Sequence, residues 1–345
     1  MSLTICDWKH GKRWVYSITY DEALEELHRF AVPYHEEFGI PGHVEAVAGH
    51  LGKVRQIGQS SYNGFHHMGP EGLRDLLARG WGVGNHSWSH EVIGPGDVQR
   101  ELGDAKKLLE DAIGAPVPLF CAPGSNVNMA DHVLEAARRF GYLGAMSITD
   151  ALNRPGDELF WLNRTPLHEQ YYEPFYSAYD PYRNIRFAQE DGGWIIDYCH
   201  CPLETAVHPN KDCSEAQLRR RFETVLAEGG DEVWCANPDE VINYHVTRRH
   251  ATVETLAQGP DEHRYRLRIA DLPPTVTCTE LTLELVTDAR WCAEPRIVVG
   301  SRAGGDAQTI IPLLVRPRTL RFTVEVCDGL EIGIGASGAQ RRICA

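Results

Sequence analysis

Two pairs of residues in this chain have the types and spacing that a catalytic metal centre needs. His86 and His90 lie four positions apart, directly after an apolar, glycine-rich segment, and Asp21 and Glu22 directly follow the apolar run 15–20. Neutral imidazole is the commonest metal ligand, and two histidines with one carboxylate form an open site that leaves a position for water. The second carboxylate is then available as a base.

The elements that must position these residues alternate between strands and helices. Short apolar runs bounded by turn residues predict strands at 15–20, 44–48, 82–85, 117–120 and 194–198. Apolar residues at helical spacing predict helices at 71–79, 97–113 and 131–140. This alternation predicts a parallel sheet or barrel, in which functional residues gather at the carboxyl ends of the strands. Asp21, His86 and His200 each follow a predicted strand directly or closely, so we expect them to meet.

The sequence pattern changes after residue 251. The runs 263–269, 280–286, 296–299 and 320–326 mostly alternate apolar and polar residues, and no helical pattern accompanies them. We therefore predict two domains, 1–251 and 252–345, of which the second is a small antiparallel β-sandwich. A packing or oligomerisation role is favoured for it over carbohydrate binding.

The order of the motifs resembles that of the polysaccharide deacetylases, carbohydrate esterase family 4, which share the NodB homology domain. The matching runs are 19–22 (Thr-Tyr-Asp-Glu, where the family has Thr-Phe-Asp-Asp), 86–90 (His-Ser-Trp-Ser-His, a full match), 119–124 (Leu-Phe-Cys-Ala-Pro-Gly, where the family has Arg-x-Pro), 140–142 (Phe-Gly-Tyr) and 194–200, the late strand that ends in a histidine. The resemblance covers about residues 10–250 and implies an α/β fold, a distorted (β/α)7-type barrel.

The resemblance also implies a role for each matched residue. Glu22, His86 and His90 would bind one divalent metal, with zinc expected and nickel or cobalt as alternatives. Asp21 would take the proton of the attacking water as general base. His200 would protonate the leaving group as general acid.

Two departures from the family pattern concern the carboxylates. Glu22 stands where the family has an aspartate, and Cys121 stands where it has the arginine that holds the catalytic Asp21. A thiol cannot form that charge-assisted pair. Arg164 is the candidate that supplies the missing guanidinium from a neighbouring strand.

Substrate contacts are expected from residues near these motifs. The run 150–190 is rich in tyrosine, and aromatic side chains in a loop can stack on sugar rings, although such a loop can also pack on itself. The residues expected to contact substrate are Pro123, Gly124, Arg164, Tyr172 and Tyr176.

Bulk properties narrow the range of partners. The chain has 345 residues and a formal net charge of -14, which disfavours nucleic acid and anionic membrane as partners. No stretch resembles a signal peptide or a membrane span, so a cytoplasmic location is expected. The ten cysteines form no Cys-x-x-Cys pair and are expected to be mostly reduced. A homo-oligomer is left open.

The predicted function is a metal-dependent hydrolase that removes an acetyl-type acyl group from an N-acylated sugar or small amide. Two alternatives stay open. One is a metal-independent hydrolase of cyclic, allantoin-type amides with the same fold, and the other is a carbohydrate-binding protein without catalysis. Asp21 could also act only as the N-cap of a helix predicted at 22–30.

Overall fold

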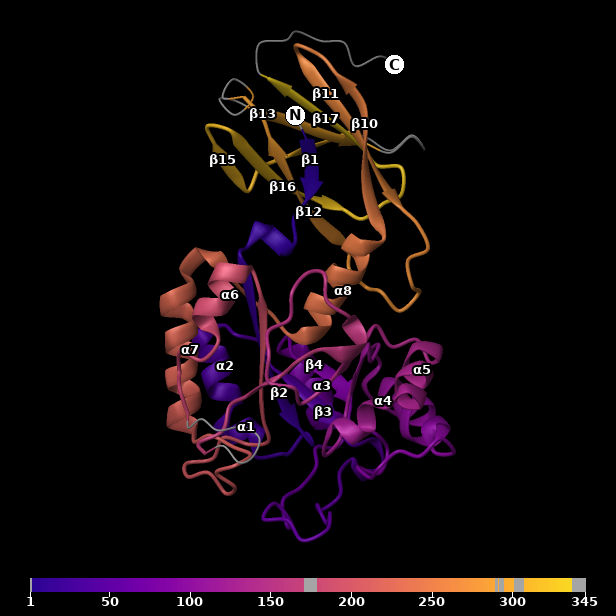
Figure 1. The fold of residues 1–345 in the computed structure, drawn as a ribbon, viewed down its shortest axis with the longest axis vertical. Helices are drawn as coiled ribbons and strands as arrows, with labels where there is room; N and C mark the ends of the chain where they lie inside the picture. Colours follow the sequence, from indigo (N-terminus) through magenta and orange to yellow (C-terminus); the bar gives the residue numbers. More distant parts are fainter. Residues whose placement is uncertain (1, 171–178, 289–290, 292–294, 301–306, 337–345) are drawn as a thin grey trace. The chain divides into compact units, whose positions relative to one another are not determined.

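The computed structural model describes residues 2–170, 179–288, 291, 295–300 and 307–336 (Figure 1). The chain divides into two compact units, Arg13–Ile242 and a second that joins Met1–Lys12 to Asn243–Ala345. We expected the boundary after residue 251 and placed the N-terminus in the first domain. The structure assigns the first residues to the second unit because β1 (Ser2–Ile5) pairs antiparallel with β12 (Glu280–Val286).

The first unit, the barrel unit, is built on a curled parallel sheet. Its described strands run in the order β6-β5-β4-β3-β2-β8-β7, and β9 pairs with the start of β2. Their bounds are β2 Trp14–Asp21, β3 His43–Ala46, β4 Gly82–Asn85, β5 Leu119–Cys121, β6 Gly144–Met146, β7 Thr165–Pro166, β8 Trp194–Cys199 and β9 Val233–Cys235. Leu162, just before β7, exchanges backbone hydrogen bonds with β6 and its neighbour Ser147, so the two ends of the order meet. The predicted (β/α) barrel is confirmed.

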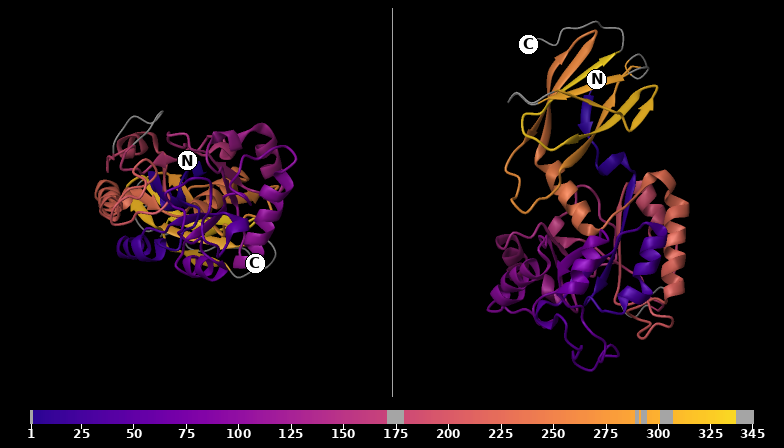
Figure 2. Two further views of the ribbon diagram at one scale, coloured as in Figure 1. Left: turned by 90° about the horizontal axis from the view of Figure 1, so that it is seen from below. Right: turned by 180° about the vertical axis from the view of Figure 1, so that it is seen from behind.

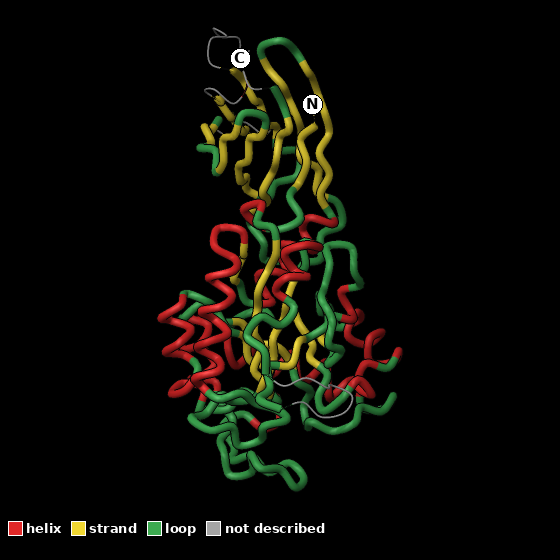
Figure 3. The backbone as a smooth tube through the Cα atoms, turned by 60° about the vertical axis from the view of Figure 1, so that its left-hand side comes forward, coloured by secondary structure: helices red, strands yellow, loops and turns green. Residues whose placement is uncertain are grey.

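Helices cover the outside of this sheet, as Figures 2 and 3 show. Their bounds are α1 Leu27–Phe30, α2 Val32–Phe38, α3 Pro70–Ala78, α4 Ala105–Ile113, α5 Asp131–Arg139, α6 Ile185–Asp191 and α7 Glu215–Gly229. The last helix, α8 (Pro238–Arg249), contains the boundary between the two units. Helix α7 begins with a capping box between Ser214 and Gln217. Every residue of β2 and β8 is buried, as expected for strands that are covered on both faces.

The described residues of the second unit form two antiparallel sheets, ordered β1-β12-β16-β15 and β10-β11-β17-β13-β14. The strands not yet given are β10 Ala251–Gln258, β11 Glu262–Ile269, β13 Pro295–Gly300, β14 Gln308–Ile310, β15 Leu314–Arg316, β16 Thr319–Glu325 and β17 Glu331–Ala336. Leu281, Leu283 and Leu285 alternate along β12 and are fully buried, which is the period-two pattern that predicted a strand here. The antiparallel C-terminal domain is confirmed.

Two further findings concern the described chain as a whole. None of its helices is long and apolar enough to cross a bilayer. The cysteines that it contains are all free.

Candidate active site

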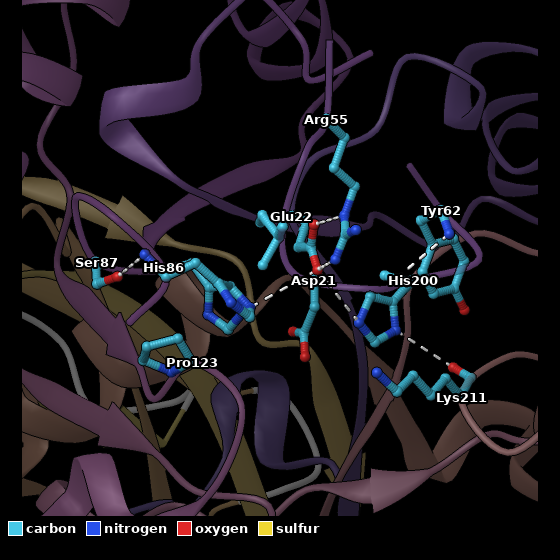
Figure 4. A network of polar contacts seen from close by, with 12 residues as sticks. Asp21, Glu22, Arg55, Tyr62, His86, Ser87, Pro123, His200 and Lys211 are labelled. Carbon is cyan, nitrogen blue, oxygen red and sulfur yellow. Dashed lines mark hydrogen bonds and ion pairs between the residues drawn. The ribbon is translucent and has the colours of Figure 1, made fainter. Parts of the chain in front are cut away.

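A cavity of about 300 Å³ lies at the carboxyl ends of the barrel strands. Asp21, His86 and His200 all line it, as expected from their positions, since Asp21 ends β2 and the two histidines directly follow β4 and β8. His90 and Glu22 line it too, and Figure 4 shows the polar contacts among most of these side chains. The barrel therefore brings the sequence-predicted residues together in one place.

The backbone turns sharply where β2 ends. Glu22 and Ala23 have φ of 72° and 47°, in the left-handed region that non-glycine residues rarely adopt. The first helix begins only at Leu27, so the helix expected at 22–30 does not start at Asp21 and the N-cap alternative is wrong. The left-handed turn lets the carboxylates of two adjacent residues face the same cavity.

Asp21 is held by a buried arginine. The Nη1 of Arg164 donates to Oδ1 of Asp21 at 2.6 Å, and Nη2 donates to Oδ2 at 3.3 Å. Burial alone would raise the pKa of Asp21, but the charge of Arg164 and its hydrogen bond to the carboxylate hold this pKa well below the usual 3.8. Asp21 is therefore ionised, which is the protonation state that a general base requires.

Arg164 thus occupies the place for which we considered it, since it directly precedes β7 and reaches across the barrel to Asp21. Cys121, at the end of β5, lies with its Sγ 3.9 Å from Oδ1 of the same carboxylate. The guanidinium of Arg164 is fully buried and does not line the cavity. The structure accordingly gives it a contact with Asp21 in place of the expected contact with substrate.

Glu22 is held by a second arginine, which the sequence did not indicate. Arg55 donates from Nη2 to Oε1 of Glu22 at 2.6 Å and from Nε to Oε2. Burial would raise the pKa of Glu22, but the Arg55 hydrogen bonds and the neighbouring positive charges lower it to about 2. The Nε2 atoms of His90 and His200 lie 3.7 and 3.8 Å from Oε1. The Glu22 carboxylate is therefore ionised, but the guanidinium of Arg55 already binds it.

The turn after β4 directs two imidazoles into the cavity. Ser87 and His90 have φ of 69° and 61°, and Ser87 Oγ accepts a hydrogen bond from His90 N at 2.9 Å. Glu101 accepts hydrogen bonds from the backbone N–H groups of Trp88 and Ser89, both at 2.9 Å. As a result the two histidine rings lie with centroids 5.0 Å apart.

Both imidazoles are in the form that binds metals. A carbonyl can only accept, so His86 Nδ1 donates to Cys121 O at 3.0 Å, and its Nε2 keeps a lone pair. Burial lowers the pKa of His86 to about 3 and also lowers that of His90. Ligand atoms of Asp21, His86 and Cys121 lie within 4.8 Å of one another. This group shares only His86 with the expected ligands, since it holds Asp21 and Cys121 in place of Glu22 and His90. Imidazole nitrogen, carboxylate oxygen and thiolate sulfur all bind zinc, so either set of donors suits such a metal.

His200 is fixed through its own backbone and its ring. Its backbone N donates to Asp212 Oδ1 at 2.7 Å, and its Nδ1 donates to Lys211 O at 3.4 Å. The ring of Tyr62 stacks on the imidazole with centroids 5.0 Å apart, and the Tyr62 hydroxyl donates to Asp212. Asp212, Tyr62 and Lys211 were not expected from the sequence, because none belongs to a recognisable motif.

The remaining expected substrate contacts divide into two groups. Gly124 lines the cavity, and Pro123 is buried beside it. Tyr172 and Tyr176 lie outside the described residues.

The motif order and this geometry agree with a comparison of the chain with known families. Residues 9–145 match the family model named polysaccharide deacetylase. The resemblance drawn from the motifs is therefore confirmed over these residues, and the match supports a divergent relative of this family of hydrolases.

The solved structures that the chain resembles are distant from it in sequence. One described as a polysaccharide deacetylase from Mycobacterium smegmatis is 17% identical, with 71% of this chain and 94% of that chain covered and a TM-score of 0.47. A family 4 acetyl xylan esterase from Clostridium thermocellum in complex with a cobalt ion is 14% identical, with 66% and 89% covered and a TM-score of 0.41. The Streptococcus pyogenes deacetylase PplD in complex with acetate is 16% identical, with 43% and 62% covered and a TM-score of 0.37. No curated protein sequence matches this chain.

Proposed function

We propose that this chain is a metal-dependent hydrolase that removes an acetyl-type acyl group from an N-acylated sugar or another small amide. The observation that carries the proposal is the convergence of an ionised carboxylate, Asp21, with the neutral imidazoles His86 and His90 in one cavity. A volume of about 300 Å³ is at the small end of ligand pockets, so it favours a compact substrate over a long polymer segment.

His86 and His90 are the proposed nitrogen ligands of the metal, and Glu22 is the proposed carboxylate ligand. When bound, a divalent cation would polarise the acyl carbonyl and make water more acidic. Glu22 is the least available of the three ligands, because Arg55 already occupies its carboxylate.

The chain's own residues account for the proton transfers. Asp21 accepts the proton of the attacking water, and Arg164 keeps this carboxylate deprotonated at neutral pH. His200 donates a proton to the leaving nitrogen as the bond between carbon and nitrogen breaks. Its ring is oriented for this by the Lys211 carbonyl and by the stacked Tyr62.

The pair formed by Arg55 and Glu22 favours one alternative. A guanidinium that binds both oxygens of Glu22 supplies a positive charge where a metal would otherwise bind, which suits a hydrolase of cyclic amides that acts without metal. The two functions differ in their metal requirement and are separable by one set of measurements.

The test measures metal content and acetate release together. Protein purified without added metal should carry about one zinc, nickel or cobalt ion per chain. His86→Ala and His90→Ala should lose both the metal and acetate release from N-acetylated sugars and small N-acetyl amides. His28→Ala is the matched control, since this partly exposed histidine lies on α1 and outside the cavity. Full activity without metal would favour the cyclic-amide alternative, and full metal content in either cavity variant contradicts the ligand assignment.

A further inference from the structure

The charges around the cavity are unevenly neutralised. The two carboxylates that line it among the described residues are each paired with their own arginine, Asp21 with Arg164 and Glu22 with Arg55. Lys211 also lines the cavity and is only partly buried. Within the described chain its Nζ forms no hydrogen bond or ion pair, because the Lys211 contacts involve only its backbone atoms. The described cavity therefore has one positive charge without a partner.

This local charge is opposite in sign to that of the whole molecule. The net charge of -14 alone favours neutral or cationic ligands. Within the cavity, however, the nearest charges dominate, since screening suppresses the contribution of distant surface carboxylates beyond about 10 Å. An anionic group is the ligand that an unpaired ammonium in a cavity attracts.

The position of Lys211 indicates which half of the substrate is anionic. Its backbone carbonyl accepts the hydrogen bond from His200 Nδ1, so Lys211 is adjacent to the proposed general acid. Figure 4 shows its side chain beside the His200 ring, with the nitrogen end on the side of Asp21. His200 delivers its proton to the leaving nitrogen, and the groups attached to that nitrogen therefore lie on the Lys211 side.

We propose that the substrate is an N-acylated amine that carries a carboxylate on its amine half, and that Lys211 binds this carboxylate. N-acyl amino acids and N-acylated amino sugar acids belong to this class. Water adds to the acyl carbon, the carbon–nitrogen bond breaks, and the products are a carboxylic acid and an amino acid or amino sugar acid. The inference rests on the proposed function, because the roles of Asp21 and His200 define the two halves of the substrate.

The experiment compares substrates that differ only in charge. N-acetyl amino acids and their carboxamides are assayed with the wild type, Lys211→Met, Lys211→Arg and the control Lys53→Met. Lys53 is an exposed lysine outside the cavity. The wild type should prefer the carboxylate by about 10–100-fold in kcat/KM, as expected for a hydrogen bond to a charged group. Lys211→Met should abolish this preference, mainly by raising KM for the carboxylate. Lys211→Arg should retain most of it, and Lys53→Met should retain all of it.

Binding measurements keep the inference separate from the proposed function. Asp21→Asn should still bind the N-acetyl amino acid, and calorimetry then compares it with its carboxamide whether or not the wild type turns either over. Equal affinity for the two compounds contradicts the role of Lys211, even where acetate release confirms the hydrolase. Tighter binding of a phosphate-bearing N-acetyl amine than of the carboxylate overturns the assignment of a carboxylate. If Asp21→Asn prefers the carboxylate but the wild type releases no acetate, the role of Lys211 is supported and the proposed function is contradicted.

Discussion

Asp21 and Glu22 are adjacent in the chain, but two different regions of the barrel unit hold them. Arg164, which holds Asp21, also donates to Thr19 Oγ1 and to the Ser147 carbonyl, so it is attached to the barrel wall. Arg55, which holds Glu22, donates instead to Asn63 within its own long loop between β3 and α3. The proposed base is therefore fixed by the barrel, whereas the proposed metal ligand is fixed by a loop that also lines the cavity.

The two attachments suit the different roles that we propose for the two carboxylates. A base must keep one position and one protonation state, which a buried partner on the barrel wall provides. A ligand must exchange its partner for a metal, which a partner on a loop allows. Substitutions in the two ion pairs should therefore have different effects.

The largest expected effect comes from Asp21→Asn. Loss of a general base should lower kcat by about 10²–10⁴-fold, while the protein still binds metal because Asp21 is not a proposed ligand. Turnover and metal content are measured on the same preparation. If the variant loses its metal and regains activity when metal is added, Asp21 is a ligand and its assignment as base is wrong.

Arg164→Ala should be the most destabilising change. Removing one partner of a buried ion pair leaves Asp21 charged and unpaired, which typically costs about 3–5 kcal/mol of unfolding free energy. Denaturant unfolding measures this cost, and Arg138→Ala is the control because its pair with Glu158 is largely exposed.

Arg164→Ala should also change the pH dependence of turnover. Arg164 lowers the pKa of Asp21, so its removal raises that pKa, and Asp21 then becomes protonated at a higher pH. The acidic limb of the kcat/KM profile should move upward. An acidic limb at the same pH as in the wild type would exclude Arg164 as the partner that keeps the base ionised.

Arg55→Gln tests the loop pair. A unit positive charge roughly 4 Å from a bound cation repels it by about 1 kcal/mol even at the dielectric constant of water, and by more when the cation is divalent. Removing the Arg55 charge removes this repulsion. Zinc affinity should therefore rise by about tenfold, measured by competition with a chelator. Arg164→Ala is the comparison, because it should not free Glu22. Unchanged affinity in Arg55→Gln would mean that Glu22 and Arg55 remain apart from the metal, as in the cyclic-amide alternative.

Glu22 also links stability to pH in a defined window. Its pKa is lowered from 4.5 to about 2, so its contribution to stability is present above pH 4.5 and is lost as the pH falls toward 2. Wild type and Glu22→Gln should therefore differ in melting temperature at neutral pH and converge on acidification. A difference that stays constant down to pH 2 contradicts the lowered pKa.

The smallest effect is expected from Cys121→Ala. Burial raises the pKa of the Cys121 thiol, and Arg164 already supplies the contact to Asp21. Metal content should stay the same, and the cost in stability should be about 1 kcal/mol. Loss of metal in this variant would instead identify Cys121 as a ligand, as its distance to Asp21 and His86 allows.

The sequence predicted the site residues that follow strands, because alternating strands and helices place strand ends at one edge. It could not predict Arg55, which contacts Glu22 across 33 positions from a loop without periodicity. Lys211 likewise belongs to no motif. The pairing of β1 with β12 was also missed, since four residues near the N-terminus are too few to show a pattern and their partner lies some 280 positions away.

The left-handed backbone at Glu22, Ala23, Ser87 and His90 has a consequence for how this protein changes over generations. Each such residue typically raises the energy of the folded state by about 1–3 kcal/mol. The residues under strain include two proposed ligands, so glycine at those positions would relax the backbone while removing the ligands. Selection for stability alone would therefore favour glycine at Glu22 and His90 and would remove two proposed ligands.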